Sequence, residues 1–166
     1  MTYSLKHLAR ANLEAALVKA AHYRDLNQPD EAESICRDVL DVDPQSQPAW
    51  KILGLAITDQ FATGHVGLLE EAVQAFERLT DEYERTYHVG VAWERAAKAH
   101  LERGEAHSAV TSFENAMGLF EKAEHLRPDS PDPILRWNRC VRLLSSHPSL
   151  KAAIHSPREE DIRLGD

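Results

Sequence analysis

Apolar residues recur every three to four positions along most of this chain, and that period is typical of helices packed on one side. Prolines, glycines and short polar runs interrupt the period at intervals. The pattern predicts eight helices and no strand, over residues 4–26, 29–42, 48–61, 68–85, 88–102, 106–126, 133–145 and 149–154. Gly104 is expected to end one of these helices, because glycine enters the left-handed backbone region at little cost. Residues 156–166 form a polar tail with little periodicity.

A short arrangement of large and small apolar residues occurs twice, each time across two successive predicted helices. The first copy is W-x-x-L-G at 50–54 followed by A-x-x-x-F at 72–76. The second is W-x-x-A-A at 93–97 followed by A-x-x-x-F at 109–113. Small residues at such offsets let two helix axes approach closely, and the aromatic residues fill the space between pairs. One helix pair cannot bury its own apolar face, so successive pairs are expected to stack.

On these residues the chain resembles the tetratricopeptide repeat (TPR) family, whose units are helix pairs of about 34 residues. The resemblance covers residues 13–146, with units beginning near Leu13, Gln47, Gly90 and Pro131. It implies an all-α fold, a right-handed α-α superhelix of about three helix pairs plus a C-terminal capping helix. Residues 1–155 are then one repeat domain, with units near 13–46, 47–89 and 90–130 and terminal helices over 131–155.

The resemblance also implies a concave groove, lined by the first helix of each pair. The predicted peptide-binding residues of this groove are Lys51, Leu55, Arg95, Lys98, Leu101, Arg136 and Arg139. The basic members form a stripe suited to a carboxylate or phosphate of a peptide, because the arginine fork matches either group. A solvated outer face on the last helix is the alternative explanation of the same charges.

Charge is unevenly distributed along the sequence. Residues 28–84 hold 13 acidic and 3 basic residues, whereas residues 134–158 hold five basic and no acidic residues. Some TPR proteins clamp the C-terminal carboxylate of chaperones with five defined side chains. Lys51 and Arg136 match that set, but Leu55, Arg95 and Asp132 do not. That particular function is therefore not carried over.

Other classes of function find little support in the sequence. The net charge is −8 and the pI about 5.6, which argues against nucleic-acid binding. No two of the nine histidines lie three or four residues apart, and we identify no catalytic motif, metal site or cofactor site. Two distant cysteines indicate reduced thiols rather than a disulfide framework. With no signal-peptide or membrane-spanning pattern, we expect a cytoplasmic protein that is not an enzyme and does not bind membranes.

Three functional hypotheses follow. The first is a scaffold or adaptor that binds a peptide or partner protein in the groove, at a site for an acidic or carboxylate group. The second is a small TPR-type chaperone for secreted proteins, such as type III secretion translocators, with which length and acidity agree. The third is a homo-oligomeric structural protein, such as a homodimer, held together through Leu5, Leu8 and Leu13 beyond the first repeat.

Overall fold

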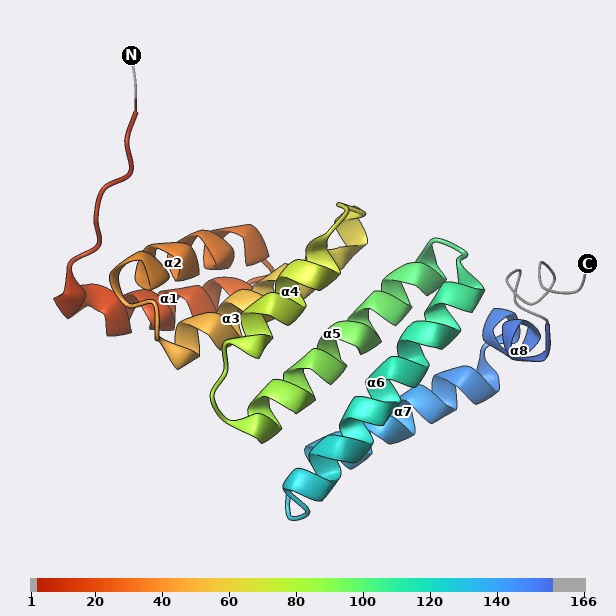
Figure 1. Cartoon of the computed structure of the whole chain (residues 1–166). Helices are drawn as coiled ribbons and strands as arrows, with labels where there is room; N and C mark the ends of the chain where they lie inside the picture. The colour runs from red at the N-terminus through yellow and green to blue at the C-terminus, as the bar shows by residue number, and fades with distance from the viewer. Residues whose placement is uncertain (1–2, 157–166) are drawn as a thin grey trace, which may run out of the picture. The chain divides into compact units, whose positions relative to one another are not determined.

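The computed structural model describes residues 3–156, and every regular element within that range is a helix (Figure 1). The α-helices follow one another as α1 (Leu13–Asp25), α2 (Pro29–Val42), α3 (Gln47–Thr58), α4 (Leu68–Glu77), α5 (Glu82–Glu102), α6 (Ala106–Leu126), α7 (Asp132–Ser146) and α8 (Pro148–His155). Two short 3-10 helices, η1 (Arg10–Asn12) and η2 (Phe61–Thr63), complete the list.

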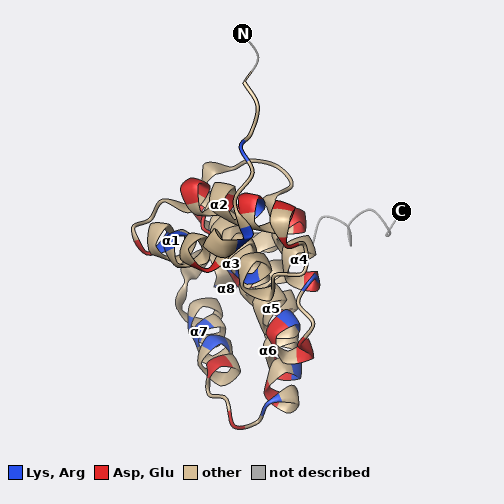
Figure 2. Ribbon diagram, turned by 90° about the vertical axis from the view of Figure 1, so that its left-hand side faces the viewer, with Lys and Arg blue, Asp and Glu red and all other residues tan. Residues whose placement is uncertain are grey.

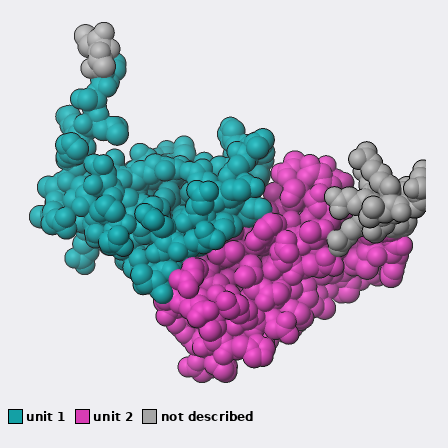
Figure 3. Space-filling model, viewed as in Figure 1, with its two compact units in different colours: residues 1–80 teal, residues 81–166 magenta. Residues whose placement is uncertain are grey.

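The contacts divide the chain into two compact units, Met1–Thr80 and Asp81–Asp166 (Figure 3). Each unit is described by itself below. The predicted single domain over residues 1–155 stays a prediction. Of the predicted polar tail, residues 157–166 lie outside the described residues.

In the first unit α1 packs on α2, α2 on α3 and α3 on α4. The last pair approach closely at Gly54, where a Cβ atom would collide with the ring of Phe76. Phe76 is completely buried. The predicted close approach of two helices at a small residue is therefore confirmed here, because only a residue without a side chain leaves room for that ring. Phe76 was expected between successive pairs, but its ring lies against Gly54 within the pair α3–α4.

In the second unit α5 and α6, of 21 residues each, lie side by side along their length (Figure 1). At Gly90 a Cβ atom would come within 2.8 Å of Cε1 of Phe120, so a glycine again permits the close approach. The turn between the helices contains Gly104 at φ +79°, which confirms its predicted place at the end of a helix. On its other side α6 packs against α7 and α8, and α8 contributes the fully buried Leu150.

The predicted boundary between the fourth and fifth helices is wrong. We expected helices over 68–85 and 88–102, but α4 ends at Glu77 and α5 begins at Glu82. A side chain from elsewhere in the chain fixes the break, because Gln47 accepts a hydrogen bond from the Thr80 backbone N–H (2.8 Å) and donates one to the Arg78 carbonyl (3.2 Å). Asp81 then caps α5 by accepting from the Glu84 N–H at 2.8 Å.

The predicted helix over residues 4–26 is also too long. Residues 3–9 have no helical structure, and the α-helix begins at Leu13. Tyr3 and Leu5 are 88% and 90% exposed and Leu8 is only half-buried, so the apolar period of this stretch buries little surface. Helix formation has a costly nucleus, and with so little tertiary packing a single short segment gains too little to offset it.

Candidate protein-binding site

The predicted groove residues fall on three helices. Lys51 and Leu55 lie on α3 in the first unit, and the remaining five lie on α5 and α7 in the second unit, where they are Arg95, Lys98, Leu101, Arg136 and Arg139. Each set is considered within its own unit. All of them except the exposed Arg139 are half-buried.

Three of the predicted cations in the second unit converge on one carboxylate. Glu94 has no exposed surface, and its Oε1 accepts a hydrogen bond from Lys98 Nζ at 2.7 Å. Its Oε2 accepts one from Arg136 Nη1, also at 2.7 Å. Arg139 lies nearby, with Nε 3.9 Å from Oε1, which is ion-pair distance but too long for a hydrogen bond. We call Glu94, Lys98, Arg136 and Arg139 the Glu94 cluster.

Local structure explains how these side chains meet. Glu94 and Lys98 are four residues apart on α5, a spacing that brings two side chains together on one face. On α7 the fully buried Pro133 and Cys140 face the unit's interior. Arg136 lies between them in the sequence.

A further contact of Arg136 depends on the early start of α5. The Arg136 Nε donates to the hydroxyl of Tyr87 at 3.1 Å, and its guanidinium carbon lies 5.9 Å from the centre of that ring. Tyr87 belongs to α5 because the helix begins at Glu82 rather than at residue 88. Tyr87 and Glu94 therefore both orient the Arg136 side chain.

The cluster is ionised and carries a positive formal charge at neutral pH. Burial alone would raise the pKa of Glu94, but the hydrogen bonds and charges of Lys98 and Arg136 outweigh it and hold that pKa below the usual 4.5. Although burial acts to lower the pKa of Arg136, its bonds to Glu94 and Tyr87 leave it raised. Three cations around one carboxylate leave a formal charge of +2.

The sequence did not identify Glu94 as the centre of this cluster. The i,i+4 spacing of Glu94 and Lys98 could have been noticed, but Arg136 is 42 residues further along the chain. That pairing follows from the packing of the second unit and has no local signal in the sequence.

In the first unit, an arginine and an aspartate from two different helices pair with each other. Arg24 on α1 donates from Nε to Asp59, at the end of α3, with a distance of 2.7 Å, and both side chains are about one fifth exposed. This ion pair links the first helices of two successive pairs. Its charges hold helices together and are largely neutralised.

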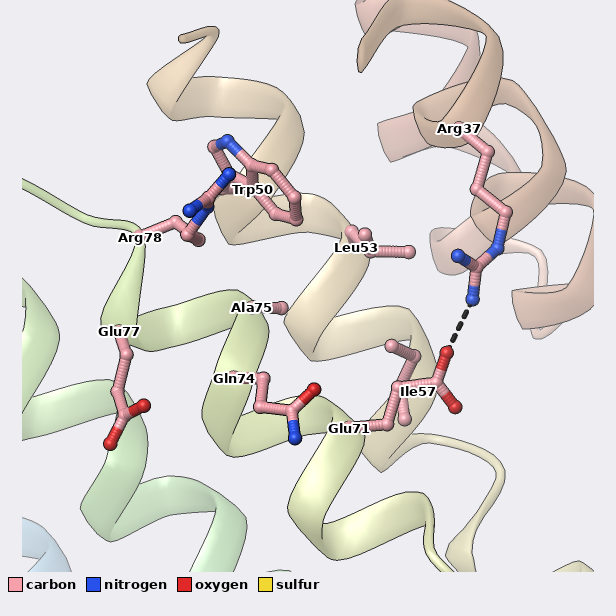
Figure 4. A pocket seen from close by; sticks show the side chains of 9 residues that line it. All are labelled: Arg37, Trp50, Leu53, Ile57, Glu71, Gln74, Ala75, Glu77 and Arg78. Carbon is pink, nitrogen blue, oxygen red and sulfur yellow. Dashed lines mark hydrogen bonds and ion pairs between the residues drawn. The ribbon is translucent and has the colours of Figure 1, made fainter. Parts of the chain in front are cut away.

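The first unit also contains a hollow of about 460 Å³, which the sequence did not predict (Figure 4). Across its rim Arg37 of α2 pairs with Glu71 of α4 at 2.5 Å, and Arg78 lies over the ring of Trp50. The lining residues are Arg37, Trp50, Leu53, Ile57, Glu71, Gln74, Ala75, Glu77 and Arg78. The formal charges of the two arginines and two glutamates in the lining cancel, and Leu53 and Ile57 are only 3% and 1% exposed. This hollow therefore carries no net formal charge, and Leu53 and Ile57 offer a ligand almost no surface.

The acidic and basic residues are separated between helices as the sequence indicated (Figure 2). Red segments recur along α2, and blue segments lie on α7. On α7 the charged residues are three arginines, Arg136, Arg139 and Arg142, and one aspartate, Asp132.

The described residues show few features of a metal site, a reactive thiol or a membrane-spanning segment. Within residues 3–156 no group of three His, Cys, Asp or Glu side chains is arranged to hold a metal ion. Cys36 and Cys140 are free and completely buried, and burial raises the pKa of each thiol to about 12. No helix in the described part of the chain has the length and apolar character needed to span a bilayer.

Comparison with known proteins supports the fold. No family model and no curated protein sequence matches the chain. Among solved structures, PcrH in complex with the chaperone binding region of PopD matches 91% of this chain and 97% of that chain, with a TM-score of 0.52 and 18% identity. PcrH from Pseudomonas aeruginosa matches 92% of this chain and 99% of that one, with a TM-score of 0.51 and 20% identity.

These matches concern architecture, since the identities are low. They span nearly the whole of both chains, as expected for proteins built from the same succession of helices. The predicted fold class, an all-α stack of TPR-like helix pairs, is thereby confirmed.

Proposed function

We propose that this chain is a non-enzymatic module that binds a segment of a partner protein on the face formed by α5 and α7. The observation that carries the proposal is the Glu94 cluster, whose exposed positive charge lies on the same two helices as the half-buried Leu101 and the 61%-exposed Leu135. Apolar contact area next to a few oriented polar groups is the usual composition of a peptide-binding surface. The free buried cysteines agree with a cytoplasmic location, which we propose with it.

A chaperone role is the more specific candidate within this function. It is favoured by the similarity to PcrH, which was crystallised with the chaperone binding region of PopD. In such a role the bound segment would belong to a protein that is poorly soluble without this chain. An adaptor would instead bind a segment of a protein that is stable alone.

Site-specific crosslinking tests the proposed face. A photoreactive amino acid is placed at Leu135 and, as a matched control, at Val141, which is also apolar and exposed on α7. The two positions are about 120° apart around the helix. We expect one partner to crosslink through position 135 in cells and not through 141, and mass spectrometry then identifies the partner and the attached segment. Identical products at both positions, or none at either, would contradict the proposal.

Co-expression separates the two roles. A chaperone should raise the soluble yield of the identified partner severalfold, whereas an adaptor should leave it unchanged. The adaptor result would remove the chaperone candidate and leave the binding function in place.

A further inference from the structure

We propose that Lys98, Arg136 and Arg139 form a recognition site for a carboxylate of the bound protein segment, and that Glu94 is the positioning residue of this site. The inference rests on the proposed function, because it names the chemistry that the α5–α7 face selects. The ligand group is the side-chain carboxylate of an aspartate or glutamate in that segment.

The first argument is the unused hydrogen-bonding capacity of the cations. Arg136 donates from Nη1 to Glu94 and from Nε to Tyr87, and within residues 3–156 its Nη2 has no recorded partner. Lys98 donates one hydrogen bond of the three that an ammonium group can make. Arg139 is 62% exposed and makes an ion pair at 3.9 Å without a hydrogen bond. A ligand oxygen can therefore be bound without breaking the contacts to Glu94.

The second argument is that Lys98 and Arg136 are already held in place before a ligand binds. Three cations on two helices repel one another, and long side chains lose rotamer freedom when they bind. The buried carboxylate offsets the repulsion and already fixes Lys98 and Arg136 at 2.7 Å from its two oxygens. Much of the entropy cost of fixing these side chains is thus met during folding rather than at binding, which favours affinity.

The third argument is charge. The cluster keeps a formal charge of +2 after Glu94 is counted, and its exposed member is an arginine, whose planar fork matches a carboxylate. Leu101 lies three residues after Lys98 on α5, and Leu135 lies four residues before Arg139 on α7, spacings that place both leucines on the same helix face as a cation of the cluster. The site therefore favours a segment in which an acidic residue is flanked by apolar ones.

The test uses a probe whose single charge is one carboxylate. The full-length protein, ¹⁵N-labelled, is titrated with N-acetyl-glutamic acid N-methylamide and, as the neutral control, with the corresponding glutamine compound. We expect saturable shifts of the Nε–H signals of Arg136 and Arg139 with the glutamate compound only. Equal shifts with both compounds, or tighter binding of inorganic phosphate than of the glutamate compound, would overturn the proposal.

Two matched variants locate the effect. Arg139→Gln removes an exposed member of the cluster, and Arg142→Gln removes an exposed arginine of the same helix that has no recorded contact with Glu94. We expect Arg139→Gln to weaken binding of the glutamate compound at least roughly threefold, as suits a partly exposed ion pair worth up to about 1 kcal/mol. Arg142→Gln should leave it nearly unchanged. Equal losses would mean that a diffuse positive field, and not this site, attracts the probe.

The positioning role of Glu94 has a separate spectroscopic readout. In the wild type the Nε–H of Arg136 should exchange slowly with water, because Glu94 and Tyr87 hold the guanidinium in place. Glu94→Gln should accelerate that exchange several-fold, whereas Glu102→Gln, an exposed position on the same helix, should not. An unchanged exchange rate in Glu94→Gln would remove the positioning role.

The partner segment identified by crosslinking distinguishes the two proposals. If it binds Arg139→Gln as tightly as the wild type, the carboxylate site is wrong and the proposed function stands. If no segment binds the wild type, the proposed function fails, while the titration with the glutamate compound still decides whether the cluster binds a carboxylate.

Discussion

The replacement of Glu94 by glutamine is the most direct test of the forces that hold the second unit together. The substitution keeps the shape of the side chain and removes its charge. Glu94 accepts two hydrogen bonds of 2.7 Å from cations, and bonds to charged groups are worth about 1.5–3 kcal/mol each. Glutamine keeps one acceptor oxygen for one of the two cations. Its NH₂ group would face the other cation, which also has only hydrogen-bond donors to offer. The cations are 28% and 29% exposed, so water replaces part of the loss.

We therefore expect Glu94→Gln to lower the free energy of unfolding by about 2 kcal/mol, which corresponds to a decrease in Tm of about 5 °C for a chain of this size. Urea denaturation followed by circular dichroism measures the first quantity and thermal melting the second. The matched control is Glu102→Gln on the same helix, which should change stability by less than about 0.5 kcal/mol because Glu102 is exposed.

The effect of Glu94 should depend on pH with a defined sign. The pKa of Glu94 in the folded protein lies below its ordinary value of 4.5, so its ionised form is favoured by folding. The stabilisation is fully present above pH 4.5 and is lost as the pH falls through the lower pKa of the folded state. The difference between wild type and Glu94→Gln should shrink from pH 7 to pH 3. The reasoning would be refuted if Glu94→Gln lowered the free energy of unfolding no more than Glu102→Gln does. It would also be refuted if the stability difference between wild type and Glu94→Gln stayed constant down to pH 3.

Three further predictions concern packing, capping and thiol reactivity. Gly90→Ala should destabilise the chain by about 1–3 kcal/mol in urea, because the new Cβ would lie 2.8 Å from the Phe120 ring. Gly118→Ala on the neighbouring helix meets no atom within 4 Å and should stabilise by about 0.5–1 kcal/mol; equal effects of the two changes would contradict the packing argument. Asp81→Ala should lower the free energy of unfolding by about 1 kcal/mol and speed amide exchange in the first turn of α5. Unchanged stability and unchanged exchange would show that the cap is dispensable. Both buried thiols, with pKa values of about 12, should stay unreactive to a disulfide reagent at pH 8 and react in guanidinium; rapid reaction of the native protein would show that they are accessible.

Features fixed by nearby residues were predicted from the sequence, whereas features fixed by distant residues were not. The helix over 106–126 was predicted at its observed ends, and the helix over 29–42 to within one residue at its start, because Pro29 and the Arg103–Gly104 turn act within a few residues of the boundaries. The close approach of two helices at Gly54 was also predicted from the repeated spacing, but Phe76, whose ring lies against it, was expected between successive pairs. The break after α4 was not predicted, because the side chain that fixes it belongs to Gln47.

The candidate site shows the same division. The sequence placed Lys98, Arg136 and Arg139 in one predicted groove, and the structure brings these three together. It gave no indication that a buried glutamate already neutralises part of their charge. Whether Lys51, Leu55, Arg95 and Leu101 contact a ligand stays a prediction.

The sequence by itself determined that this chain is a succession of paired helices, because helix period, glycine, proline and repeated small residues all act locally or at fixed offsets. Tertiary structure alone decided the start of α5 and the charge of the candidate site. The physical reason is that burial and long-range pairing set these features. A carboxylate stays ionised in a protein interior when cations surround it, and here two of its three cations come from α7.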